Sequence, residues 1–336
     1  MFDLSVSTNA SLDLRHESPS QVHISFIVFH NITNFPGIAS GSQVSYHSIL
    51  ALNVRTEIAY GMSKDGCTAL FWRNEHSTFL AQNWDWQEEQ QENLINLNIR
   101  QESKPSISMI TEAGIIGKIG LNSSGVGVCL NAIRALGVDF ERLPCHLALR
   151  SCLESESVGQ AVATLQKAGV ASACHILVAD SHEAVGLECT NVDIIGLPTK
   201  SVLTHTNHLL KPHSGVEDKM ALQDSPVRLE RIDKLVQQAK LEAQGPLRTE
   251  TIRALLADED NLPTAICRAR TRESSVATLF SIVIDLRKPS AEVTMGRPSE
   301  GGETLYLNPM IDSEITIPKS LTSRSPSWLM AIGRRI

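Results

Sequence analysis

The sequence has no excess of positive charge and no long apolar segment, and each absence argues against a class of protein. The formal net charge is −7 over 336 residues, with a pI near 5.9. Nucleic acids and anionic membranes bind basic surfaces that displace their counterions, so we expect neither as a partner. The apolar run from His23 to Phe29 is too short to cross a bilayer and does not follow a basic segment, which argues against secretion.

The seven cysteines are an odd number without regular spacing, and several lie in apolar stretches such as residues 126–130. Reduced thiols in a cytosolic protein fit this pattern better than a disulfide framework. The sequence ends in Arg334-Arg335-Ile336, which is not a peroxisomal tripeptide of the Ser-Lys-Leu type. We therefore expect a cytoplasmic location.

No histidine or carboxylate pattern indicates a metal site. His205 and His208 lack the helical i, i+4 spacing, and no Cys-x-x-Cys accompanies them, so structural histidines are the better interpretation. The run Asp258-Glu259-Asp260 lacks the glycine that a hard-cation loop requires and is interpreted as a helix end. We expect no metal and no cofactor.

The hydrophobic pattern divides the chain into a weakly patterned start, two groups of strands and intervening helices. Residues 1–44 show no sustained apolar period, and a helix is predicted from Ser48 to Tyr60. Short β-like runs separated by polar or glycine turns follow at 68–72, 78–82, 94–99, 106–111, 115–121 and 125–131. This order predicts a meander of antiparallel strands.

Helices and strands then alternate in groups. Helices are predicted from Pro144, over 157–169, from Asp224 and over 249–257; the third has Leu229, Ile232, Val236 and Ala239 on one face. Strands are predicted at 175–179, 184–189, 201–205, 276–286 and 291–295, before a Ser/Pro-rich tail near Pro309. The order indicates an α+β protein, a four-layer αββα sandwich, rather than a doubly wound parallel sheet.

The run Lys64-Asp65-Gly66-Cys67-Thr68 has two interpretations. Glycine adopts backbone conformations closed to other residues, so its carbonyl could turn toward the thiol of Cys67 and allow an N-to-S acyl shift. Hydrolysis of that thioester would leave an α-amine able to act as the base for its own thiol. On spacing alone the alternative is favoured, in which Asp-Gly is a turn and the cysteine a small buried residue.

Several motifs change that preference because they occur together and in order. They are Asp65-Gly66-Cys67-Thr68-Ala69, Gln82-Asn83-Trp84-Asp85, residues 110–118, residues 122–126, His205-Thr206-Asn207-His208, residues 257–261, residues 277–280 and Gly296-Arg297-Pro298. Over residues 46–308 the sequence resembles the acyl-coenzyme A:isopenicillin N (6-aminopenicillanic acid) acyltransferase family of the N-terminal-nucleophile hydrolases. The resemblance implies that fold and self-cleavage between Gly66 and Cys67.

The resemblance also implies roles for single residues. Cys67 matches the nucleophile, Asp85 a residue that orients its surroundings, and Asn207 the asparagine whose amide holds the oxyanion. Without it, Asp85 would be interpreted as a strand-end cap or a solvent-facing carboxylate and Asn207 as a turn residue. Thr190, Ser274 and Ser275 match substrate-binding positions.

The match fails at one substrate position. At Ser275 the family has an arginine that engages the substrate carboxylate, and a hydroxyl does not replace a guanidinium fork. Arg270 or Arg272 is the candidate replacement.

The expected organisation has four parts: a divergent segment 1–45, the end of an α-subunit at 46–66, a catalytic β-subunit at 67–308 and a tail at 309–336. The two fragments should form a heterodimer. The expected activity is that of a self-processing acyltransferase of penicillin biosynthesis or a related pathway, made as a zymogen. Its small-molecule substrates are acyl-coenzyme A, as co-substrate, and an amine or β-lactam acceptor. Two alternatives remain open: an amidohydrolase of a conjugated amino acid or peptide-like metabolite, and an unprocessed, inactive paralogue.

Overall fold

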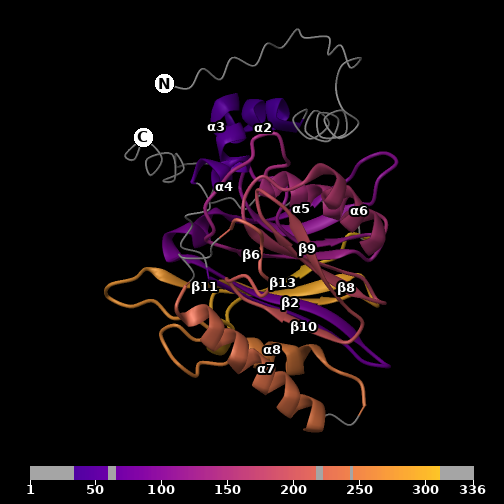
Figure 1. Cartoon of the computed structure of the whole chain (residues 1–336), viewed down its shortest axis with the longest axis vertical. Coiled ribbons are helices and arrows are strands. Elements are labelled where there is room, and N and C mark those ends of the chain that lie inside the picture. The colour runs from indigo at the N-terminus through magenta and orange to yellow at the C-terminus, as the bar shows by residue number, and fades with distance from the viewer. Residues whose placement is uncertain (1–33, 60–65, 217–221, 243–244, 311–336) are drawn as a thin grey trace.

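Two antiparallel β-sheets face each other at the centre of the protein (Figure 1). The computed structural model describes residues 34–59, 66–216, 222–242 and 245–310. The first sheet has six strands in the order β10-β1-β2-β11-β12-β13: β1 (Gly66–Arg73), β2 (Thr78–Gln87), β10 (Val202–His205), β11 (Val276–Asp285), β12 (Ser290–Met295) and β13 (Thr304–Leu307).

The second sheet is an antiparallel meander of seven strands in sequence order. It contains only the last four of the six runs predicted as one meander, because the runs at 68–72 and 78–82 lie in the first sheet. The seven strands are β3 (Leu94–Ile99), β4 (Ile107–Glu112), β5 (Ile119–Asn122), β6 (Gly127–Ala132), β7 (Cys174–Ala179), β8 (Ala184–Cys189) and β9 (Ile194–Thr199). A 3₁₀ segment, η2 (Glu88–Asn93), joins β2 to β3, and a shorter one, η3 (Pro298–Glu300), joins β12 to β13.

Helices cover the outer face of each sheet and complete the four layers (Figure 1). The second sheet is covered by α5 (Cys145–Leu153) and α6 (Val158–Ala168), and the first by α7 (Asp224–Glu242) and α8 (Thr249–Leu256). The predicted αββα order is therefore confirmed. Among the described residues, no helix is long and apolar enough to cross a membrane.

Strand β1 is buried on both faces, which is why its sequence is almost continuously apolar. Ala69 and Phe71 lie in the core between the two sheets, whereas Leu70 and Trp72 pack with residues of α7 and α8. Because side chains alternate along a strand, Cys67 shares the inner face with Ala69 and Phe71. The nucleophile candidate is thus held in a central strand of the fold.

The N-terminal helices pack as a separate group against the loop before β5. They are α2 (Asn34–Ser42), α3 (Tyr46–Asn53) and α4 (Arg55–Ile58). Phe35, Ile49 and Leu52 bury their side chains against Ile115 and Ile116.

Some element predictions were wrong. The segment 34–42 is a helix, α2, although it lies in the stretch interpreted as weakly patterned. Residues 1–33, and residues 311–336 of the tail predicted at 309–336, lie outside the described residues. The helix predicted over 48–60 divides into α3 and α4, and the strand predicted over 115–121 begins only at Ile119. The sequence did not predict β9, β13 or the 3₁₀ segments.

Candidate active site

Cys67 is the second residue of β1, and hydrogen bonds from other parts of the chain hold both its backbone N–H and its backbone carbonyl. In the ladder between β1 and β2 it lies opposite Trp84, and only 1% of its surface is exposed. Its backbone N–H donates to Asn207 Oδ1 at 2.8 Å, and its carbonyl oxygen accepts from Arg228 Nη1 at 2.6 Å. The nucleophile candidate therefore has a defined backbone position.

Asn207 follows β10, and its partners fix the orientation of its side-chain amide. Oδ1 accepts from the Cys67 N–H and from Arg228 Nη2, both at 2.8 Å, while Nδ2 donates to the carbonyl of Ala132 at 2.9 Å. Exchanging the oxygen and nitrogen would set donors against donors. The oxygen of this amide therefore faces the nitrogen that would become the α-amine of Cys67.

Asp85 lies opposite Gly66 in the same ladder and is fully buried. It accepts from Thr278 Oγ1 at 2.7 Å and is 3.4 Å from Arg268 Nε. Burial raises the pKa of Asp85, and the positive charges of Arg268 and Arg228 partly oppose this rise. The alternative interpretation of Asp85 as a solvent-facing carboxylate is wrong.

The glycine at position 66 is required by a close approach, not by an unusual backbone angle. The φ angle of Gly66 lies outside the left-handed region, but a Cβ there would be 2.7 Å from Asp85 Oδ2 and 3.1 Å from Arg268 Nε. Only a residue without a side chain lets the Asp85 carboxylate approach this bond so closely.

Two arginines and an aspartate that the sequence analysis did not identify complete the site. Arg228 also donates to Thr68 Oγ1 at 3.1 Å and to Asp224 Oδ2 at 2.8 Å, and Asp224 in turn pairs with Arg268. Together with Asp85 they form a row of alternating charges next to residues 66–68, in the order Asp85, Arg268, Asp224 and Arg228. Their charges compensate one another, which makes their burial tolerable.

The three substrate-binding predictions fall in two places. Thr190 Oγ1 donates to Asp193 Oδ1 at 2.7 Å and caps the turn between β8 and β9. Ser274 and Ser275 lie in the loop before β11, where the carbonyl of Ser275 accepts from the Glu88 N–H at 2.9 Å. The structure therefore does not bring Thr190 together with the two serines.

A cavity of about 330 Å³ is lined by residues that contact Asp85 and Ser275. Glu88, Thr278 and Arg297 are among its lining residues. Thr278 also binds Asp85, and Glu88 pairs at 2.6 Å with Arg270, whose side chain is 67% exposed. Arg270 and Ser275 therefore both contact Glu88, a residue that lines this cavity.

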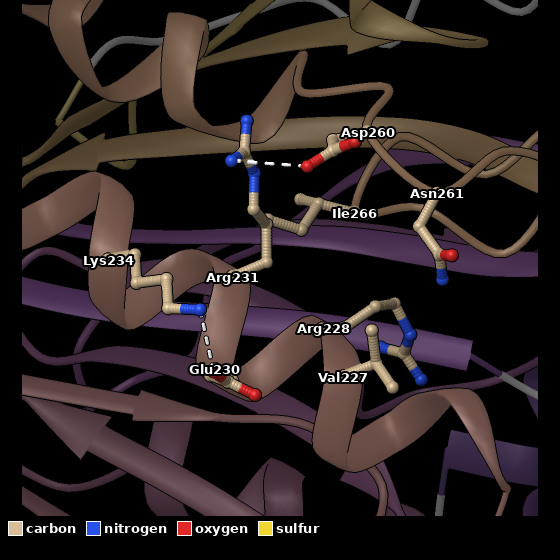
Figure 2. A pocket seen from close by; sticks show the side chains of 8 residues that line it. All are labelled: Val227, Arg228, Glu230, Arg231, Lys234, Asp260, Asn261 and Ile266. Atoms are coloured by element: carbon tan, nitrogen blue, oxygen red, sulfur yellow. Dashed lines mark ion pairs between the residues drawn. The ribbon is translucent and has the colours of Figure 1, made fainter.

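A second cavity, of about 150 Å³, lies between α7 and the segment that carries Asp260, Asn261 and Ile266 (Figure 2). Its charged side chains pair with one another: Arg231 with Asp260 at 3.2 Å and Lys234 with Glu230 at 2.6 Å. Arg228 is the residue that belongs both to this lining and to the surroundings of Cys67. Neither Cys67 nor Asn207 lines this cavity, so we do not regard it as the reaction site.

The histidines and acidic residues considered for a metal are engaged with other groups. His205 pairs with Glu188, Asp258 with Arg231, and Glu259 with Arg297. Within the described ranges, no group of three or more His, Cys, Asp or Glu side chains is arranged to hold a metal ion.

The four layers, with Cys67 at the start of an inner strand, form a fold of the N-terminal-nucleophile hydrolase type. Among solved structures, the chain is similar to a variant of conjugated bile acid hydrolase from Clostridium perfringens. The TM-score is 0.51 and the identity 13%, with coverage of 71% of this chain and 96% of that one.

The chain belongs to the family described as acyl-coenzyme A:6-aminopenicillanic acid acyl-transferase, whose profile matches residues 72–300. It is 39% identical over 278 residues to the 40 kDa form of acyl-coenzyme A:6-aminopenicillanic-acid-acyltransferase from Emericella nidulans, which covers 81% of this chain and 76% of that protein. The predicted family, and with it an acyltransferase enzyme, are confirmed.

Proposed function

We propose that the chain cuts itself between Gly66 and Cys67 and then uses the Cys67 thiol to transfer an acyl group from acyl-coenzyme A to an amine. The observation that carries this proposal is the restraint of the backbone around Cys67. Asn207 Oδ1 holds its N–H at 2.8 Å, Arg228 holds its carbonyl at 2.6 Å, and Asp85 lies against Gly66. Holding a reacting group in one geometry lowers the entropic part of its barrier.

The cleavage begins with attack of the Cys67 sulfur on the carbonyl carbon of Gly66. The S–C bond forms, the C–N bond breaks, and the nitrogen takes up the proton that the thiol releases. Water then hydrolyses the thioester, giving a carboxylate on Gly66 and restoring the thiol. Asp85 and Arg268 are the charged groups adjacent to Gly66.

The new α-amine acts as the base for the thiol in the transfer reaction. Its reference pKa of about 7.7–8.0 suits proton exchange near neutral pH, and Asn207 Oδ1 already accepts from this nitrogen. Asn207 Nδ2 has a second hydrogen besides the one donated to Ala132. That hydrogen is the oxyanion donor in this proposal, a role worth about 2.7–4 kcal/mol in other enzymes.

The fragment before the cut is held by buried polar contacts as well as by apolar packing. Asn53 donates to the carbonyl of Gly114 at 2.8 Å and accepts from the Ile116 N–H at 3.0 Å. Glu57 accepts from the Cys145 N–H at 2.9 Å and from Ser172 Oγ at 2.7 Å. These contacts support a heterodimer of the two fragments after cleavage.

The recombinant wild-type chain tests this function directly. Denaturing electrophoresis and mass spectrometry should give two fragments, one ending at Gly66 and the other beginning at Cys67. With phenylacetyl-coenzyme A as donor, release of the coenzyme A thiol should rise when 6-aminopenicillanic acid is added. A persistent full-length chain without thiol release would contradict the proposal.

Hydrolysis is the second candidate because Ser275 stands where the family arginine would engage the acceptor carboxylate. An acceptor bound less firmly leaves water to compete for the acyl-enzyme. Thiol release that ignores every amine in a small panel would favour an amidohydrolase.

We expect Arg270 to take over the missing carboxylate contact. Its guanidinium has five N–H donors, its bond to Glu88 uses Nη1, and Glu88 adjoins Ser275. Arg270→Ala should raise KM for a carboxylate-bearing acceptor by about tenfold, the value of one charge-assisted hydrogen bond. KM for the methyl ester of the same acceptor should not change.

Arg272→Ala is the matched control for this prediction, since it removes a neighbouring exposed arginine and should leave both KM values unchanged. A rise in KM in the Arg272 variant alone would assign the contact to that residue instead.

A further inference from the structure

A buried carboxylate outside the proposed reaction centre anchors the loop that carries Asn207. Glu188 lies on β8 of the second sheet and is fully buried. Its Oε1 accepts from His205 Nε2 at 3.0 Å and from the Leu210 N–H at 2.5 Å, and its Oε2 accepts from the Lys211 N–H at 3.0 Å. One carboxylate therefore binds the chain both before and after Asn207.

We propose that Glu188 is a positioning residue for the proposed reaction, and that it acts by fixing the loop of residues 206–211 so that Asn207 meets Cys67. The inference rests on the proposed function. Asn207 lies between the two attachment points, at His205 and at residues 210–211. Its contact with the Cys67 N–H therefore depends on the position of this loop.

Two histidines lie against the Glu188 carboxylate. His205 Nδ1 faces the carbonyl oxygen of Thr206 at 2.9 Å, and Nε2 faces the Glu188 carboxylate. Both ring nitrogens therefore face oxygen atoms, which fixes the ring between Thr206 and Glu188. His213 lies with Nε2 3.5 Å from Glu188 Oε2 and pairs with Asp193 through Nδ1.

The ionised form of Glu188 is favoured despite its burial. Burial would raise the pKa of Glu188, but the hydrogen bond from His205 and those from the two backbone N–H groups lower it below its usual range. His175 stacks on the His205 ring at 3.5 Å between centroids and binds Asn131 at 2.9 Å. Burial and the neighbouring His205 lower the pKa of His175, which favours its neutral form.

The loop is held on its other side by the start of α7. Ser225 Oγ accepts from the Asn207 N–H and bonds His208 Nδ1, both at 2.7 Å, and the carbonyl of Ser225 accepts from Thr206 Oγ1 at 2.9 Å. Glu188 supplies the opposite attachment, from the second sheet. Asn207 is thus clamped between the two halves of the sandwich.

The substitution Glu188→Gln removes the charge and one acceptor with little change of shape. An amide has one acceptor oxygen, and its NH₂ group would face at least one of the donors that the carboxylate now satisfies. The loop should shift, and a displacement of about 1 Å can cost about a hundredfold in rate. We expect kcat for thiol release to fall about tenfold to a hundredfold, with KM within about threefold of wild type.

Glu154→Gln is the matched control. Glu154 is also a hydrogen-bonded carboxylate with little exposure, 9% for its side chain, bonded to Arg150 Nε at 2.8 Å and Lys104 Nζ at 2.6 Å at the end of α5. It should lose a comparable amount of thermal stability and keep wild-type cleavage and kcat. A merely structural role for Glu188 predicts the same behaviour in both variants.

The experiment measures cleavage by electrophoresis, kcat and KM with phenylacetyl-coenzyme A, and the melting temperature of each full-length variant. Glu188→Asp keeps the charge, but its shorter side chain moves the carboxylate oxygens away from the loop, so it should give an intermediate kcat. This variant provides the test if Glu188→Gln does not fold. A wild-type kcat in Glu188→Gln or Glu188→Asp would overturn this inference and leave the proposed function standing. So would a fall in kcat for Glu154→Gln as large as that for Glu188→Gln. A wild-type chain that is neither cleaved nor active would overturn the proposed function as well.

Discussion

Replacing Cys67 with alanine should leave one full-length chain and lower the rate of thiol release by about 10⁴-fold or more, the scale seen when a nucleophile is removed. Attack on Gly66 and attack on the acyl donor would both use this sulfur. Because the change removes only one buried atom, the free energy of unfolding should fall by about 1 kcal/mol. Electrophoresis, thiol release and a melting curve measure the three effects.

Two further variants separate the nucleophile from buried thiols in general. Cys129 lies in the same core between the sheets, so Cys129→Ala makes the same change without removing the nucleophile and should still be cleaved. Cys67→Ser keeps a weaker nucleophile and should be cleaved slowly. If Cys67→Ala still gave fragments that meet at residues 66 and 67, another group would perform the attack.

The sequence predicted strands well where both the apolar pattern and the turns were regular. The strands β3 and β8 have the predicted bounds because each lies between clear polar turns. The sequence missed β9 and β13, which are edge strands, as β3 also is. Edge strands tolerate residues that a central strand excludes, and β9 contains Gly196 and Pro198. Their pairing depends on a neighbouring strand already being in place, which no local pattern records.

The candidate site was only partly predictable for a similar reason. The sequence identified Cys67, Asp85 and Asn207 by resemblance, and the structure brings all three to residues 66–67. Arg228 and Glu188 are recognised only by their contacts in the fold. Arg228 binds Cys67, 161 residues away in the sequence, and Glu188 binds Leu210, 22 residues away. A periodic apolar pattern does not reveal such contacts.

One local signal for Arg228 was present. The predicted apolar face of the helix used Leu229 and Ile232, whereas the structure buries Arg228 and Ile232, with Leu229 only partly buried. A charged residue at the position of an apolar stripe is a sign of a buried ion pair.

Arg228→Met should be the most damaging change outside the nucleophile. The guanidinium, 1% exposed, donates to the Cys67 carbonyl, Thr68 Oγ1, Asn207 Oδ1 and Asp224. Methionine fills much of the space but leaves these acceptors without that donor. Breaking a buried ion pair by removing one partner typically costs about 3–5 kcal/mol. Urea unfolding should show a loss of this size.

Cleavage and transfer should fail along with stability, because Arg228 fixes both the Cys67 carbonyl and the orientation of the Asn207 amide. Arg231→Met is the control on the same helix: it removes a half-exposed arginine paired with Asp258 and Asp260, a contact worth about 0–1 kcal/mol. That variant should be cleaved normally. If Arg228→Met were stable and cleaved at the wild-type rate, the carbonyl and amide contacts would have no part in the reaction, and Asp85 with Asn207 would have to position Cys67 unaided.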